Sequence, residues 1–142
     1  MSRLLTRMLL FITLLSLTAC TAIKNKGIKE DFEKDLKDFN RLVRWYEVEK
    51  AGMLYMEPEG RGVYLKTAED IKRRAVSITD YRILTNECLP EVGSGDAVVE
   101  FDYYIMPSNR IKTLTYRQIW KYRELNEKKS WKITNSPLPA FD

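Results

Sequence analysis

The chain has 142 residues, of which 44% are hydrophobic and 31% charged, with a formal net charge of +4, two cysteines and no histidine. This length and composition are typical of one globular domain. The absence of histidine excludes Ser-His-Asp and Cys-His catalysis and any histidine-ligated metal site. Two cysteines are too few for a disulfide scaffold or a four-cysteine zinc site. We therefore expect no metal and no cofactor.

The first 20 residues have the pattern of a secretion signal. Arg3 and Arg7 form a positively charged start, and an apolar run over residues 8–17 follows them. This run is too short to cross a bilayer, which needs about 20 apolar residues. A buried core helix is the alternative, but its extreme N-terminal position behind two arginines favours the signal.

The end of this segment, Leu17-Thr18-Ala19-Cys20, resembles the lipobox of bacterial lipoproteins. The resemblance implies that the chain is cut before Cys20, that Cys20 receives a diacylglyceryl thioether, and that the new amino terminus is acylated. Two or more acyl chains anchor a protein stably to a membrane. Thr21, where aspartate would favour retention in the inner membrane, indicates sorting to the outer membrane of a Gram-negative cell.

The expected organisation has three parts. Residues 1–19 form the signal peptide, residues 20–27 form the lipidated cysteine and a short extended polar tether, and residues 28–142 form a single domain. The expected location is the bacterial cell envelope, anchored by lipid and facing the periplasm. Nucleic acid is not an expected partner.

One long amphipathic helix is predicted over residues 28–50. Phe32, Leu36, Phe39, Val43 and Tyr46 recur at gaps of three and four and form one apolar stripe. An irregular or partly helical crossing segment is expected over residues 52–62. A short helix is expected over residues 67–74, with Thr67 as its N-cap.

Four strands are predicted to complete the chain. They cover residues 76–84, 97–106, 112–123 and 130–134, where hydrophobic and polar residues alternate. The alternation changes phase near Thr79 and Asp80, which predicts a β-bulge. The links are short, so neighbouring strands should pair antiparallel. The expected fold is α+β, a long helix packed on a curved antiparallel sheet of about four strands in a cone-like roll.

This order of elements resembles the nuclear-transport-factor-2-like, cystatin-related superfamily. The resemblance is carried by Val76-Ser77-Ile78-Thr79-Asp80-Tyr81-Arg82-Ile83, Ala97-Val98-Val99-Glu100-Phe101, Thr115-Tyr116-Arg117-Gln118-Ile119-Trp120, Trp131-Lys132-Ile133 and Ser136-Pro137-Leu138-Pro139-Ala140-Phe141. The superfamily includes isomerases, dehydratases and cyclases that work inside the cone. The compressed helical region of this chain departs from the three full helices of many members.

Catalytic candidates are few. The resemblance implies a carboxylate and a phenol on the inner sheet face, and only Asp80, Tyr81 and Tyr103 offer such a pair, because Asp102 is expected to face water. Five aromatic residues either line a ligand pocket or fill a small core: Trp45, Phe101, Tyr103, Tyr116 and Trp120. A buried carboxylate facing a cavity would favour catalysis, and an interior filled by these rings would argue against it.

Basic residues gather on the later strands. Alternation places Arg117, Lys121 and Arg123 on one outer face, which is either an anion-binding surface or an ordinary solvated one. Once Cys20 carries lipid, Cys88 has no intramolecular partner and is either a small buried residue or a site of intermolecular disulfide formation.

Two functions from different classes follow. The first is a non-enzymatic, lipid-anchored envelope protein whose domain is an interaction or ligand-binding module. Its partner would be a protein, a second copy joined through the sheet, or a small apolar ligand. The alternative is a small-molecule enzyme or carrier that uses the cone. The first is preferred because no histidine is present.

Overall fold

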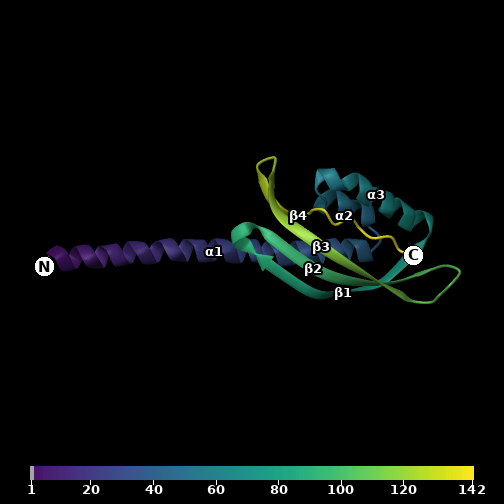
Figure 1. Cartoon of the computed structure of the whole chain (residues 1–142), viewed down its shortest axis with the longest axis horizontal. Coiled ribbons are helices and arrows are strands. Elements are labelled where there is room, and N and C mark those ends of the chain that lie inside the picture. The colour runs from purple at the N-terminus through teal and green to yellow at the C-terminus, as the bar shows by residue number, and fades with distance from the viewer. Residues whose placement is uncertain (1) are drawn as a thin grey trace.

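The computed structural model describes the backbone of residues 2–142 and the side chains of residues 21–142. It has the expected α+β fold, in which N-terminal helices precede a four-stranded antiparallel open sheet (Figure 1). The elements are α1 (Ser2–Arg44), α2 (Val48–Tyr55), α3 (Pro58–Arg73), β1 (Val76–Leu89), η1 (Pro90–Val92), β2 (Ser94–Ile105), β3 (Lys112–Leu125) and β4 (Lys128–Ile133).

The apolar stripe of α1 is buried as predicted, but the helix ends earlier than expected. Phe32, Leu36, Phe39 and Val43 are almost fully buried. The helix ends at Arg44, and Tyr46 then adopts a left-handed backbone with φ of 66°. Tyr46 is 41% exposed, so its predicted place in the stripe is wrong. The last buried position of the stripe is therefore Val43.

The segment expected to be a short polar tether is helical. Residues 20–27 belong to α1, which runs without a break into the domain. Lys26 and Glu30 form an i, i+4 ion pair at 3.8 Å on this stretch, a pairing that supports a helix. Eight helical residues span about 12 Å, whereas an extended chain of that length reaches up to about 28 Å. The helix projects from the domain toward the N-terminus (Figure 1).

The segment after α1 is more regular than predicted. Two helices meet at Met56 and Glu57, and Pro58 begins α3, a position that favours proline. Thr67, the predicted N-cap, lies inside α3 because this helix begins nine residues earlier. A Cβ atom on Gly52 would lie 2.3 Å from the ring of Tyr64. Glycine therefore permits the close approach of α2 and α3.

The four strands form a meander in the order β1-β2-β3-β4. The predicted bulge is confirmed, because the register of β1 against β2 shifts between Ile78 and Asp80. A second shift lies between Ile83 and Thr85. The strand β1 continues to Leu89, past its predicted end, because its polar second half pairs with the start of β2. At the opposite edge of the sheet, Met56 forms a parallel bridge with Ile133 of β4.

Two tight hairpin turns lie near the point where α1 leaves the domain (Figure 1). The β3–β4 turn uses Asn126 and Glu127, with φ of 51° and 63°, the left-handed pair that two-residue hairpins favour. The β1–β2 turn contains η1 and Gly93, with φ of 58°. A Cβ atom on Gly95 would lie 2.5 Å from the ring of Phe32. The start of β2 therefore packs directly against α1.

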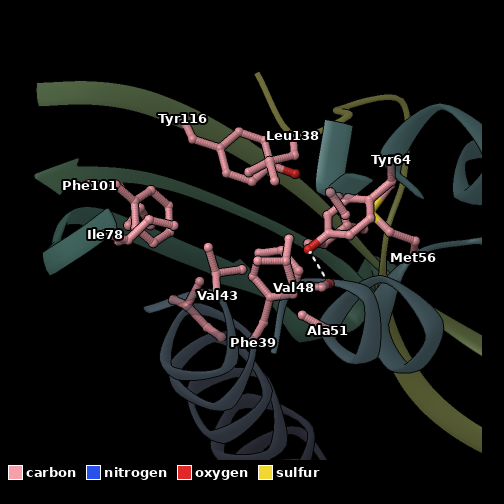
Figure 2. Close-up of a cluster of buried hydrophobic side chains, with 14 of the residues drawn as sticks. Phe39, Val43, Val48, Ala51, Met56, Tyr64, Ile78, Phe101, Tyr116 and Leu138 are labelled. Atoms are coloured by element: carbon pink, nitrogen blue, oxygen red, sulfur yellow. Dashed lines mark hydrogen bonds between the residues drawn. The ribbon is translucent and has the colours of Figure 1, made fainter. Parts of the chain in front are cut away.

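The core lies between the helices and the inner face of the sheet. Figure 2 shows Phe39 and Val43 of α1, Val48 and Ala51 of α2, and side chains of the sheet pointing into one cluster. Tyr64 of α3 donates its hydroxyl hydrogen bond to the Val48 carbonyl at 3.0 Å. The C-terminal segment closes the core with buried Leu138 and Phe141.

Candidate functional site

Four of the five predicted pocket residues form part of the packed core. Phe101, Tyr116 and Trp120 are 0–2% exposed, and Tyr103 is 4% exposed. The Trp120 ring centroid lies 5.8 Å from that of Phe39. Of the two alternatives that the sequence left open, these four aromatic side chains therefore fill the core.

Trp45, the fifth predicted pocket residue, lies outside the core and lines an open surface hollow of about 380 Å³ together with Arg44 and Tyr46. Trp45 is 67% exposed. It follows the last residue of α1, Arg44, so the spacing of the helix no longer decides which way its side chain points. The Arg44 guanidinium carbon lies 5.1 Å from the Trp45 ring centroid, a cation–π distance. The same arginine donates a hydrogen bond to the Ile78 carbonyl at 2.8 Å.

The core contains a polar cluster that sequence reasoning missed. The Gln118 amide donates to Asn40 at 2.7 Å, and Asn40 donates to the Leu36 carbonyl at 2.8 Å. The Trp120 indole N–H donates to Gln118 at 3.3 Å. Both amides are fully buried. Gln118 shares its parity with Tyr116 and Trp120, so the alternation already indicated that this polar side chain points inward.

The catalytic candidates are not brought together. Asp80 is exposed at the bulge, where its carboxylate accepts a hydrogen bond from the Tyr81 backbone N–H at 2.8 Å. The Tyr81 ring packs 6.2 Å from Phe101. The Tyr103 hydroxyl donates to the Asp142 carbonyl at 2.6 Å. Each group is therefore bonded to a different partner, and the structure assembles no carboxylate–phenol pair from these residues.

The phenols inside the core are also committed to backbone groups. The Tyr116 hydroxyl donates to the Ser136 carbonyl at 2.6 Å. Burial raises the pKa of Tyr116 and Tyr64 well above the usual range of a phenol. Both groups therefore stay protonated and serve as structural hydrogen-bond donors.

The outer face of the sheet carries a network of ion pairs. Arg82 of β1 binds Asp102 of β2 at 2.5 Å and Glu100 at 3.1 Å. Thr113 of β3 donates to Asp102 at 2.8 Å. The hydrogen bond from Arg82, followed by that from Thr113, lowers the pKa of Asp102. Asp102 lies on the outer face, as predicted, and crosslinks three strands there.

The predicted anion-binding residues lie on this outer face, but two of their charges are already paired. Arg117 binds Asp96 at 2.5 Å, and Arg123 binds Glu57 at 2.7 Å. Lys121 donates to the Ser94 hydroxyl at 3.1 Å. Burial favours protonation of Glu57, but hydrogen bonds from Arg123 and Thr134 outweigh it and lower the Glu57 pKa. Carboxylates of the same chain therefore neutralise two of the three positive charges that were predicted to bind an anion.

A shallow hollow of about 650 Å³ lies over the outer face. Five polar residues and one apolar residue, Val98, line this hollow. The polar residues are Thr85, Asn86, Glu87, Asp96 and Arg117. Ile119 of β3, which pairs with Asp96 of β2, is also half-buried. This part of the outer face therefore mixes apolar and charged side chains.

An open cleft of about 600 Å³, the exit cleft, lies where α1 leaves the domain. It lies between α1, η1, the end of β3 and the β3–β4 hairpin. The Asn25 amide of α1 donates to the Glu91 carboxylate of η1 at 3.3 Å. The Trp131 indole N–H of β4 donates to the Ile28 carbonyl at 3.0 Å. These two bonds hold both hairpins against the helix.

A smaller polar cleft of about 340 Å³ separates α1 from α2 and β4. Burial, with a smaller contribution from Asp31 and Asp38, raises the pKa of Asp35. Burial also lowers the pKa of Lys132 and raises that of Tyr55 to about 12. Within residues 21–142, no group of three or more cysteine, aspartate or glutamate side chains is arranged to hold a metal ion.

Of the two cysteine side chains, the structure describes only that of Cys88. The Cys20 side chain, the predicted lipidation site, lies outside the described side chains. Cys88 is half-buried, has no disulfide partner among the described residues, and has its pKa raised by burial. The part of the chain that the structure describes contains no helix that is both long enough and apolar enough to span a membrane.

Comparisons with known proteins give one distant likeness to report. Neither the protein-family models nor the curated proteins contain a match to this chain. Among solved structures, the chain is similar to the crystal structure of the intermembrane space region of the chloroplast protein ARC6, at 10% identity and a TM-score of 0.42. The match covers 74% of this chain and 95% of that one. The likeness is too weak to indicate a function.

Proposed function

We propose that this chain is a lipid-anchored protein of the bacterial cell envelope, held in the outer membrane and facing the periplasm. The anchor is Cys20, and the proposal depends on the lipobox-like Leu17-Thr18-Ala19-Cys20 behind a charged and apolar N-terminal run. The domain begins about 12 Å after this cysteine along a helix. Such a short connection keeps the domain next to the membrane.

The domain acts as a non-enzymatic interaction module. The observation that carries this part of the proposal is the filled interior, where Phe101, Tyr103, Tyr116 and Trp120 pack on one another and on the helices. The tyrosine hydroxyls are bonded to the C-terminal backbone. Among residues 21–142, whose side chains the structure describes, the buried stripe of α1 packs on the inner sheet face, and the outer face is left as the surface for a protein partner or a second copy of the chain.

The composition of the outer face supports this role. Half-buried Val98 and Ile119 provide apolar area beside the Arg117–Asp96 ion pair, and the Arg82 ion pairs lie farther along β2. A non-obligate protein interface is as a whole about as apolar as the rest of a protein surface, and this mixture of apolar and charged side chains is compatible with such a role. The order of helices and strands also supports a relationship to the nuclear-transport-factor-2-like superfamily, which forms part of the same proposal.

The anchor is tested by metabolic labelling of cells with a fatty-acid analogue. We expect the wild-type chain and Cys88→Ser to incorporate the label and to be cut before Cys20. Cys20→Ser should remain unlabelled and uncut. Cys88→Ser is the matched control, because it removes the only other cysteine. Equal labelling of Cys20→Ser and the wild type would refute the anchor.

The outer-face module is tested by a photoreactive amino acid placed at Val98 on this face. A matched probe at Glu59, exposed on α3, serves as the control. Crosslinking in living cells should give a discrete product, either with a second copy or with a partner protein, from position 98 and not from position 59. The same pattern from both positions, or none from either, would contradict the assignment of this face.

A further inference from the structure

Exposed apolar side chains gather at the end of the domain where α1 leaves it. Ile23 of α1 is 73% exposed and Val92 of η1 is 69% exposed. Leu89 at the end of β1 and Leu125 at the end of β3 are also exposed. They come from three separate segments. The β1–β2 turn lies beside α1 where the helix leaves the domain, and the β3–β4 turn stands away from the helix at the same end of the sheet (Figure 1).

This end is held at a short distance from Cys20. The bond between Asn25 and Glu91 attaches η1 to the helix five residues after Cys20, which corresponds to about 8 Å along the helix axis. The bond between Trp131 and the Ile28 carbonyl attaches β4 about one turn farther on. The two hairpins therefore stay near the cysteine as long as α1 is helical.

The distance matches the thickness of the polar layer of a membrane. A bilayer of about 40–45 Å with a hydrocarbon core of about 30 Å has a headgroup layer of roughly 5–8 Å on each side. When the acyl chains on Cys20 lie in the hydrocarbon, the tip of η1 reaches the headgroups. Apolar side chains that would otherwise face water gain free energy by entering this layer.

Charge at this end is balanced. The exit cleft is lined by three basic and three acidic side chains: Lys24, Arg123, Lys129, Asp31, Glu91 and Glu124. Such a surface is neither repelled by nor strongly attracted to anionic lipids. Contact with the membrane therefore depends on the apolar side chains and should change little with salt.

We propose that this end of the domain docks on the same membrane leaflet that holds the acyl chains of Cys20, with Ile23 and Val92 entering the headgroup layer. The inference depends on the proposed lipid anchor. In this orientation the strands run away from the membrane. The β2–β3 turn and Trp45, at the opposite end of the domain, then point into the periplasm (Figure 1).

The test uses the lipidated full chain in vesicles of phosphatidylethanolamine and phosphatidylglycerol. In a Cys88→Ser background, an environment-sensitive fluorophore is attached to Val92→Cys, while the lipidated Cys20 cannot react. The matched control is Met106→Cys, an exposed residue at the opposite end of the sheet. The emission at position 92 should shift to the blue on vesicle binding and be quenched by headgroup spin labels, in low and high salt alike.

The position 106 fluorophore should emit as it does in water. Chain that sediments with the vesicles but shows equal emission at positions 92 and 106 would overturn the docking while leaving the anchor intact. Chain that does not sediment with the vesicles would overturn both proposals. A blue shift at position 92 that disappears in high salt would also contradict docking through apolar side chains.

Discussion

The two faces of the sheet satisfy their polar groups in different ways. On the inner face, Gln118 and Asn40 bond to each other among aromatic rings, with no access to water. On the outer face, Arg82 and Asp102 bond to each other while both remain partly exposed. Loss of a buried partner leaves its counterpart unsatisfied, whereas water replaces a lost partner at the surface. Loss of a polar partner should therefore cost more stability on the inner face than on the outer face.

The largest expected effect is on the inner face, from Trp120→Ala. Trp120 is fully buried and packs against Phe32, Phe39 and Tyr55, so its removal should lower the free energy of unfolding by about 3–5 kcal/mol. Urea unfolding measures the loss. Trp45→Ala is the matched control and should cost only about 0.5 kcal/mol, because this ring is exposed. Equal losses would contradict the assignment of Trp45 to the surface.

A smaller effect is expected from the buried polar cluster. Gln118→Leu removes the donor to the Asn40 side-chain oxygen and the acceptor of the Trp120 indole N–H, and should lower the free energy of unfolding by about 1–3 kcal/mol. Adding Asn40→Leu should recover part of this loss, because no unpaired amide then remains. A double variant as unstable as the sum of the two single ones would show that the cluster does not act as a unit.

Steric contact between α1 and the sheet is tested by Gly95→Ala. The new methyl group would meet the Phe32 ring at 2.5 Å, so the ring must move, at about 1–3 kcal/mol. Gly62→Ala in α3 is the control. Its methyl group meets nothing within 4 Å, and alanine should stabilise the helix by up to about 1 kcal/mol. Thermal unfolding of both variants should therefore shift in opposite directions, and a shift in the same direction would contradict the close packing.

Replacement of the half-buried Asp35 by asparagine should raise the free energy of unfolding at neutral pH. Burial raises its carboxyl pKa, so its ionisation disfavours the folded state, and its contribution to stability is lost as the pH rises from about 3.9 through the raised pKa. Asp35→Asn should be more stable than the wild type at pH 7 and equal to it at pH below about 3. Urea midpoints across this range measure the gap. Asp31→Asn, one turn earlier and exposed, should gain less.

The smallest effect is expected on the outer face, from Arg82→Gln. The hydrogen bond from Arg82 lowers the pKa of Asp102, so the stability that it provides is present above about pH 3.9 and is lost as the pH falls through the lowered pKa. Solvent and salt screen this pair, so the urea midpoint at pH 7 should move less than for any inner-face variant. A loss as large as that of Gln118→Leu would erase the difference between the two faces.

Local patterns in the sequence predicted much of the fold. The stripe of Phe32, Leu36, Phe39 and Val43 depends only on helical spacing, and the bulge at Asp80 follows from a change of phase within one strand. Antiparallel pairing followed from the short links. These features depend on residues close together in the chain, which is why they were predictable.

The prediction of the site was less accurate, because the site depends on contacts between residues that are far apart in the sequence. The helix end that exposes Trp45 has no proline or glycine to mark it; Tyr46 turns there and donates its hydroxyl to the Ile71 carbonyl at 3.4 Å. Alternation placed Arg117 on the correct face, but its partner Asp96 comes from a neighbouring strand. Strand parity could have identified Gln118 as buried, and only the fold shows that Asn40 meets it.

The central claim is that Cys20 anchors the domain to the membrane. The most direct measurement is the intact mass of the protein extracted from the cell envelope. We predict the mass of residues 20–142 plus a diacylglyceryl group and an amide-linked acyl chain, with the modification located on Cys20 by fragmentation. The mass of the full 142-residue chain, or of an unmodified chain cut at another position, would contradict the account.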